Sequence, residues 1–145
     1  MSDKKFLLIT KKELFYSAVM LRIRKLVNVV YDFPADDSKF GRELKEARKT
    51  LWRKGLLEIS SSGEDNISFV LSVCVSFCAN PDSCEVVDSY GYSASVYRAS
   101  SMYMLMENRE DDTEELLAVA WFADKNNLDS YITSQIETRK GALLR

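Results

Sequence analysis

The stretch that decides the fold is residues 38–81, SKFGRELKEARKTLWRKGLLEISSSGEDNISFVLSVCVSFCANP. Its first part is an amphipathic helix, because apolar residues recur at helical spacing: Phe40, Leu44, Ala47 and Leu51. Ser38 is placed to cap this helix, and Gly55 is placed to end it in a left-handed conformation. A polar turn at residues 60–65 and an apolar segment at residues 67–78 follow.

The apolar segment at residues 67–78 fits two structures. Its larger apolar residues alternate with smaller ones, as in a half-buried strand. Ser68, Ser72 and Ser76 also lie four residues apart, so they would form one polar ridge on a helix. Periodicity does not choose between the two structures, and both remain open on this evidence.

A strand and a long helix are predicted to precede this stretch. Phe6–Ile9 is a short apolar run that is typical of a strand. Thr10 and Glu13 match a capping box, in which each side chain binds the backbone amide of the other residue. Apolar residues continue around a wide arc to about Val30, which predicts a helix that is buried on most sides.

The remainder of the chain favours β-structure. Three strands with short connections predict an antiparallel meander: residues 84–90, 93–107 and 116–122. A last helix is predicted at residues 128–137, with Asn126 or Asn127 as its cap. The sequence therefore predicts one α+β domain over residues 1–145, with N-terminal helices followed by an antiparallel β-meander and a C-terminal helix.

The composition excludes several classes of protein and of catalytic site. No apolar run approaches the length of a membrane span, and the run after Lys5 is too short for a signal peptide. We therefore expect a cytoplasmic protein. The chain has no histidine, which excludes Ser-His-Asp and Cys-His catalytic pairs and leaves too few ligands for structural zinc. Three cysteines are predicted to pack as small hydrophobic residues: Cys74, Cys78 and Cys84. We expect no enzymatic activity, metal or cofactor.

Charge is distributed unevenly along the chain. Residues 1–55 contain 14 Lys/Arg against 7 Asp/Glu, a net +7, whereas residues 56–145 contain 6 against 15, a net −9. Four basic residues share one outer face of the predicted helix in the first part: Arg42, Lys45, Lys49 and Arg53. The face would suit phosphates or acidic side chains, and it would equally suit a solvated helix surface.

A second group of candidate binding residues lies on the meander's long strand and in the loop that follows it. Methionines on one face of a strand form an adaptable surface for a partner, unless helices cover them. The loop that follows is acidic and would suit a basic partner. The predicted partner-binding residues are Met102, Met104, Met106, Glu107, Arg109, Glu110, Asp111 and Asp112.

Three motifs follow one another along the chain: Ile9-Thr10-Lys11-Lys12-Glu13-Leu14, Ala47-Arg48-Lys49-Thr50-Leu51-Trp52-Arg53-Lys54-Gly55-Leu56 and Ala79-Asn80-Pro81. In this order they resemble EspG and its EsaE-like counterparts, cytosolic chaperones for type VII (ESX) secretion substrates. The likeness spans about residues 8–122. Members of that family are longer, so we expect this chain to be a fragment or a short relative.

The resemblance implies that residues 67–78 are helical and that the chain binds a secreted substrate or toxin, masking its apolar surface. An immunity protein that neutralises a basic toxin is a related alternative. The alternative from another class is a winged-helix nucleic-acid binder using the basic helix, residues 39–54, with residues 60–65 as its wing. Glu64 and Asp65 count against nucleic acid, because they would place negative charge near phosphates.

Overall fold

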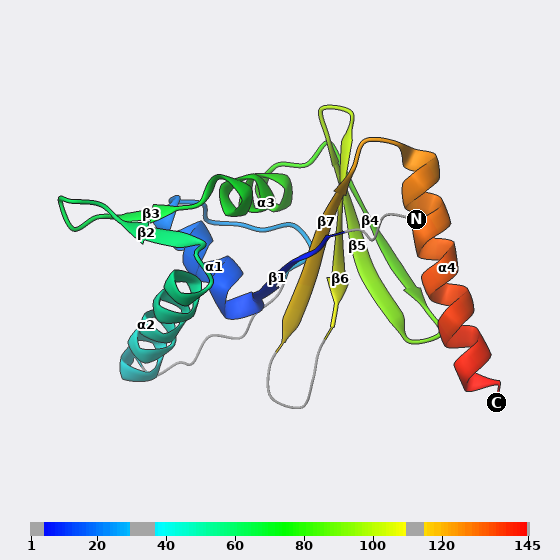
Figure 1. Cartoon of the computed structure of the whole chain (residues 1–145), viewed down its shortest axis with the longest axis horizontal. Coiled ribbons are helices and arrows are strands. Elements are labelled where there is room, and N and C mark those ends of the chain that lie inside the picture. The colour runs from blue at the N-terminus through cyan, green and yellow to red at the C-terminus, as the bar shows by residue number, and fades with distance from the viewer. Residues whose placement is uncertain (1–4, 30–36, 110–114, 145) are drawn as a thin grey trace. The chain divides into compact units, whose positions relative to one another are not determined.

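The chain folds into two compact units (Figure 1). The computed structural model describes residues 5–29, 37–109 and 115–144. One unit, here the helical unit, is Thr10–Ala79; the other, the sheet unit, combines Met1–Ile9 with Asn80–Arg145. Within the described ranges, no helix has both the length and the apolar character needed to cross a bilayer.

The helical unit contains three helices and a β-hairpin. Its elements are α1 (Lys11–Met20), α2 (Asp37–Arg53), β2 (Leu57–Ile59), β3 (Asp65–Ile67) and α3 (Phe69–Ala79). The strands β2 and β3 pair antiparallel around the predicted polar turn. On α2, Ala47 and Leu51 are buried whereas Phe40 and Leu44 are half-buried, so the predicted inner face is confirmed.

The helix α1 is shorter than predicted. Its capping box is confirmed, because the Thr10 hydroxyl accepts from the Glu13 amide and the Glu13 carboxylate accepts from the Thr10 amide. The helix ends at Met20 rather than near Val30, since Arg22 takes a left-handed φ of 58°. The Ile23 amide then donates to the Ala18 carbonyl at 2.8 Å, as in a Schellman ending. Glycine usually occupies the left-handed position that Arg22 takes here, so the sequence contains no residue that signals the end of the helix.

The helix α2 ends as the sequence predicts. Gly55 has a φ of 76°, in the left-handed region. The Gly55 amide donates to the Trp52 carbonyl at 3.1 Å, and the Leu56 amide donates to the Leu51 carbonyl at 2.9 Å. These two bonds form a Schellman motif, and they turn the chain directly into β2.

The ambiguous segment is mainly helical. Residues 65–67 form β3, and α3 begins at Phe69. The Ser68 hydroxyl accepts from the Leu71 amide at 3.3 Å, so Ser68 serves as the N-cap. The helical interpretation that the family resemblance implied for this segment is therefore the structure that the chain adopts.

The sheet unit is a five-stranded sheet with one helix. Its elements are β1 (Leu7–Thr10, whose last residue is the first of the helical unit), β4 (Ser83–Ser89), β5 (Tyr92–Ala99), β6 (Met102–Asn108), β7 (Leu116–Phe122) and α4 (Lys125–Leu143). The strand order is β1-β7-β6-β5-β4, and β4 to β7 form an antiparallel meander. The prediction of an α+β fold with a C-terminal helix is confirmed.

The predicted strand at residues 93–107 is wrong, because the chain reverses in its middle. Ser100 and Ser101 have φ values of 49° and 69°, so they form a two-residue turn between β5 and β6. Positive φ at both central residues is the type I′ pattern, which normally contains Asn or Gly. Two serines gave no such signal in the sequence.

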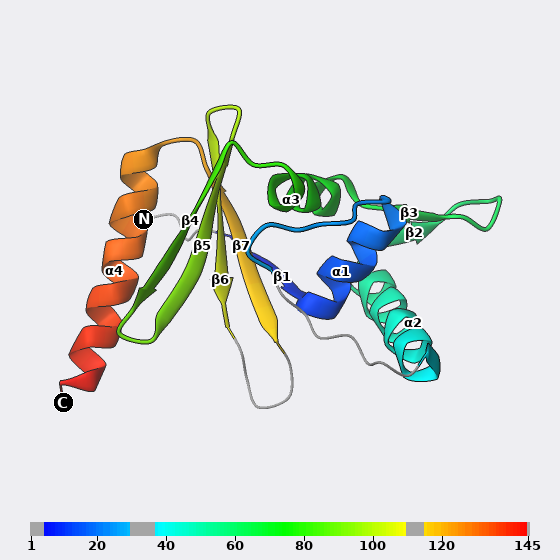
Figure 2. The same ribbon diagram turned by 180° about the vertical axis from the view of Figure 1, so that it is seen from behind.

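The helix α4 covers one face of the sheet (Figure 2). Leu128 is buried with Tyr92, Leu105 and Phe122 in one apolar cluster. The predicted caps Asn126 and Asn127 are wrong: the Asp124 carboxylate accepts from the Asn126 amide at 2.8 Å, and the helix starts at Lys125. It also extends past residue 137, to Leu143.

Candidate functional site

The methionines predicted to bind a partner all lie on β6. Met104 and Met106 are only 0% and 3% exposed, and Met102 is half-buried. Side chains alternate along a strand, so these methionines occupy the face opposite the one on which Leu105 packs with α4. Tyr97 lies across from Met104, and it is also buried. Met104 and Met106 therefore do not form an exposed surface.

Glu107 lies at the end of β6 and is 2% exposed. Its Oε2 atom accepts from the hydroxyls of Tyr92 at 2.7 Å and Tyr131 at 2.9 Å. Its Oε1 atom accepts from Nε of Arg109 at 3.1 Å and from Nη2 at 2.7 Å. A buried carboxylate is costly unless it is hydrogen-bonded, and these four bonds satisfy both of its oxygens.

The groups around Glu107 hold it as part of an internal cluster. Burial, reinforced by the hydrogen bond to Glu107, raises the pKa of Tyr131 to about 12. The same two causes raise the pKa of Tyr92 far above its usual value. Both phenols therefore remain protonated donors at neutral pH. The Arg109 guanidinium lies 4.7 Å from the centre of the Phe6 ring, a cation–π contact.

Glu107 and Arg109 thus bind each other rather than presenting free charges to a partner. The other acidic residues predicted for this surface, Glu110, Asp111 and Asp112, lie outside the described residues.

The helical unit buries a carboxylate of its own. Glu13 is fully buried, and its Oε1 atom accepts from the Thr10 amide at 2.9 Å and from Nζ of Lys54 at 2.5 Å. Its Oε2 atom accepts from the Thr50 hydroxyl at 2.5 Å. The carboxylate that caps α1 therefore also binds Thr50 in the last turn of α2 and Lys54 just after it, which fixes one helix against the other.

Asp65 connects the hairpin to both helices. Its carboxylate accepts from the Tyr16 hydroxyl at 2.6 Å and from Nε and Nη2 of Arg48 at 2.7 and 2.9 Å. The hydrogen bonds from Arg48, then from Tyr16, lower the pKa of Asp65. The negative charge of Asp65 is therefore matched inside the unit, whereas Glu58 and Glu64 on the same hairpin are exposed.

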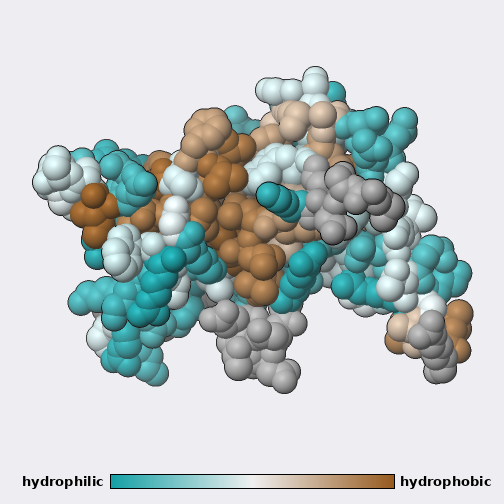
Figure 3. Space-filling model, viewed as in Figure 1, coloured by the Kyte–Doolittle hydropathy of each residue, from teal (hydrophilic) through white to brown (hydrophobic). Residues whose placement is uncertain are grey.

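The basic stripe of α2 lies on the surface, as the helical spacing predicted. Its four members are all exposed: Arg42, Lys45, Lys49 and Arg53. Figure 3 shows hydrophilic side chains along this helix. The stripe could contact carboxylates or phosphates, because both are anionic.

Four exposed apolar residues lie at the end of α2, at the end of β2 and at the start of α3, and the sequence did not reveal them. We call these four residues the aromatic patch: Trp52, Ile59, Phe69 and Val70, whose exposed fractions are 58%, 49%, 84% and 39%. The Ser68 amide donates to the Leu56 carbonyl at 2.9 Å, which brings the start of α3 next to the end of α2. Figure 3 shows apolar side chains gathered over the hairpin and α3.

One signal for this patch was present in the sequence. Trp52 follows Leu51, the last residue of the inner face of α2, and precedes Arg53 of the basic stripe. A tryptophan at that position lies off the buried face of the helix. Phe69 gave no such signal, because a strand and a helix both accommodate it within an apolar run.

Other chemistry-bearing groups are few. Cys74 and Cys78 are buried free thiols, as predicted, and Cys84 is half-buried. In the part of the chain that the structure describes, no cluster of three or more Cys, Asp or Glu side chains could hold a metal ion. The aromatic patch with its adjoining basic stripe is therefore the strongest candidate site in the helical unit.

Comparison with models of known protein families finds no match to this chain. A search of curated proteins finds no significant match either.

Proposed function

We propose that this protein is a cytoplasmic, non-catalytic chaperone or adaptor that binds another protein and masks an apolar surface on it. The resemblance to EspG and EsaE-like chaperones implies that the partner is a type VII secretion substrate or a toxin. In the second case the chain acts as an immunity protein, with the same mode of binding. The aromatic patch is the observation that supports this proposal.

The patch has the composition of a binding surface. Exposed apolar groups that cluster on a protein surface commonly mark interaction sites, and tryptophan is among the residues that contribute most to binding. Burying the Phe69 side chain would contribute roughly 1.5–3 kcal/mol. Its 84% exposure means that nearly all of this is available to a partner.

Charge specifies the partner further. Lys49 and Arg53 are exposed on the helix that also carries Trp52. A partner with an apolar surface bordered by acidic groups would therefore complement both features. Masking such a surface prevents aggregation through shape and burial alone, so no covalent step is required.

Co-expression tests the proposal. The chain should co-purify with a small helical secreted protein encoded by a neighbouring gene, and the double variant Phe69→Ser/Trp52→Ser should lose that complex while remaining folded. The matched control is Leu144→Ser, which removes another exposed apolar side chain, 77% exposed, and should retain the complex. A complex that survives the double variant, or no complex with any such protein, would refute the proposal.

A nucleic-acid-binding function is the second candidate, and the exposed basic stripe of α2 favours it. The helix is followed by a hairpin, as in a winged-helix domain. Glu58 and Glu64 are exposed on that hairpin and would repel phosphates. This function predicts a salt-dependent mobility shift that Lys45→Glu/Lys49→Glu abolishes, and the absence of any shift at low salt would exclude it.

A further inference from the structure

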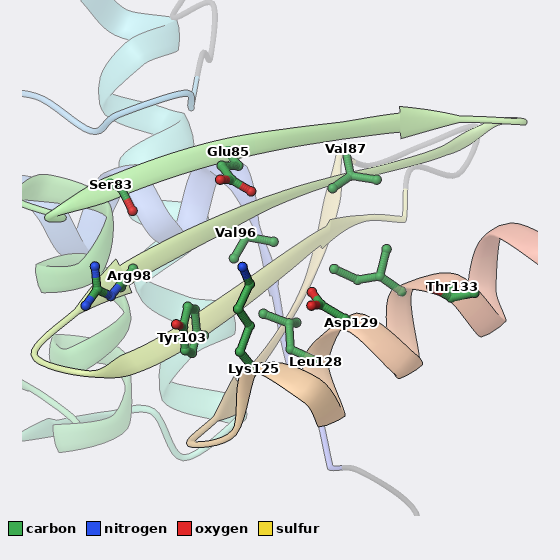
Figure 4. A pocket seen from close by; sticks show the side chains of 11 residues that line it. Ser83, Glu85, Val87, Val96, Arg98, Tyr103, Lys125, Leu128, Asp129 and Thr133 are labelled. Atoms are coloured by element: carbon green, nitrogen blue, oxygen red, sulfur yellow. The ribbon is translucent and has the colours of Figure 1, made fainter.

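A pocket of about 370 Å³ lies between the sheet and α4 in the sheet unit (Figure 4). Ligand pockets in proteins typically enclose roughly 300–1,000 Å³. Aliphatic side chains form its apolar part: Val87, Val96, Leu128 and Ile132. Four charged side chains also line it: Glu85, Arg98, Lys125 and Asp129. The pocket is therefore amphipathic, with two charges of each sign around an apolar centre.

These charged groups are available to an occupant. All four residues are exposed. Among the residues that the structure describes, none of the four side chains forms an ion pair. An incoming group would therefore not have to displace an existing partner.

The charges have an order along the pocket. On β4, Ser83 lies across from Arg98, and Glu85 lies across from Val96. Figure 4 shows Arg98 at one end of the pocket, Lys125 nearer the middle, and Asp129 on the side away from Arg98. A ligand that matches this order presents an acidic group to Arg98, an apolar group at Val96, and a basic group to Asp129.

The pocket adjoins the open edge of the sheet. β4 is the last strand in the sheet order, and within the described part of the chain only β5 pairs with it. It pairs with β5 without a bulge over its 7 residues, Ser83–Ser89. Alternate backbone N–H and C=O groups of an edge strand face outward, and an extended peptide can pair with them as an added strand.

An extended peptide could both pair with β4 and place side chains in the pocket. We propose that β4 binds an extended segment of a partner protein as a sixth strand, with alternate side chains entering the pocket. Side chains two residues apart lie on one face, so the recognised pattern is basic-x-aliphatic-x-acidic when the segment runs antiparallel to β4. This site lies in the sheet unit and does not depend on the aromatic patch.

A designed peptide tests the recognised pattern. The probe is acetyl-TKTITET-amide, titrated into the ¹⁵N-labelled full chain, with amide shifts followed by NMR. We expect saturable shifts at β4, β5 and the first half of α4. Peptides with Lys at both charged positions, or Glu at both, should bind about tenfold more weakly, because one attraction becomes a repulsion. Equal affinities for the three peptides, or shifts only elsewhere, would overturn the proposal.

A charge reversal in the protein tests the same contact from the other side. Asp129→Lys should weaken binding of the probe by about tenfold, and it should strengthen binding of the peptide with Glu at both charged positions. Glu137→Lys is the control, since it makes the same charge change on an exposed part of α4 that does not line the pocket. An Asp129→Lys variant that binds all peptides as the unmodified chain does would contradict the assignment.

Backbone pairing is tested separately. Alternate amides of a bound strand face β4, so two versions of the probe are N-methylated, one at its odd residues and one at its even residues. Each version removes the amides that would pair with β4 in one of the two possible registers. One version should lose binding and the other should keep it; retention by both would exclude strand addition. Light scattering at increasing concentration tests a competing occupant, because a dimer that Val86→Lys dissociates would show that β4 instead pairs with a second copy.

Discussion

Each unit buries one paired carboxylate, Glu107 in the sheet unit and Glu13 in the helical unit, but the two units differ in the side chains around their candidate sites. In the sheet unit, large apolar side chains such as Met104 and Tyr97 are buried, and among the described residues the four charged side chains around its pocket form no ion pair. The helical unit pairs Glu13 and Asp65 internally and leaves Trp52 and Phe69 exposed. Residue type alone therefore does not locate a binding surface. The candidate surfaces are where charged groups lack an ion-pair partner among the described residues, or where apolar groups remain exposed.

The largest expected effect is at the buried carboxylate of the sheet unit. Glu107→Ala leaves the hydroxyls of Tyr92 and Tyr131 and the guanidinium of Arg109 without their acceptor. We expect the free energy of unfolding to fall by about 3 kcal/mol. Urea denaturation measures it, with exposed Glu137→Ala as the control. A loss no larger than that of the control would show that the cluster does not stabilise the unit.

A smaller effect is expected at the buried carboxylate of the helical unit. Glu13→Ala removes the acceptor of Thr10, Thr50 and Lys54. The Lys54 side chain is 36% exposed, so water can solvate its ammonium group once Glu13 is gone. We therefore expect a loss of about 2 kcal/mol, less than for Glu107→Ala. The reverse order of the two losses in urea denaturation would contradict the comparison.

The two left-handed helix ends should respond in opposite directions. Gly55→Ala introduces a Cβ at a φ of 76°, with no atom within 4 Å of it, so the cost is conformational alone, about 1 kcal/mol. Arg22→Gly relieves a φ of 58° and should raise the midpoint of thermal unfolding by a few degrees. Shifts of the same sign in both variants would show that the helix ends are not under the inferred strain.

At neutral pH the tyrosine cluster should add no pH dependence. Its phenols have pKa values raised above that of a free tyrosine, to about 12 for Tyr131. The unfolded chain loses these protons near pH 10 and the folded chain loses them later, so stability is complete below pH 10 and declines as pH rises toward 12. Thermal unfolding between pH 7 and 12 measures this decline, which Tyr131→Phe should reduce. A flat profile in the unmodified chain would contradict the raised pKa values.

The sequence predicted those features that depend on local chemistry. The capping box at Thr10, the end of α2 at Gly55 and the α+β order of elements are confirmed, since each has a residue that favours one conformation. Arg22 and Ser100 adopt left-handed backbone without such a residue, and there the prediction was wrong. No local pattern marks them.

The candidate sites depend on tertiary contacts, so fewer of their features could be predicted from local sequence patterns. Glu107 was predicted to begin an acidic loop, whereas Tyr92 and Tyr131, far from it in the sequence, donate hydrogen bonds to its carboxylate. Phe69 lies in an apolar run that fits a half-buried strand or a helix, and the structure leaves it exposed at the start of α3. The basic stripe of α2 was predicted correctly because helical spacing alone places it on one face.

Hydrogen–deuterium exchange on the complex with a secreted partner tests the central proposal most directly. If the aromatic patch binds the partner, amides in residues 52–59 and 67–72 should exchange more slowly in the complex than in the free chain, and Phe69→Ser should abolish the difference. Protection confined to other parts of the chain, with residues 52–59 and 67–72 unchanged, would show that the protein does not act through this patch.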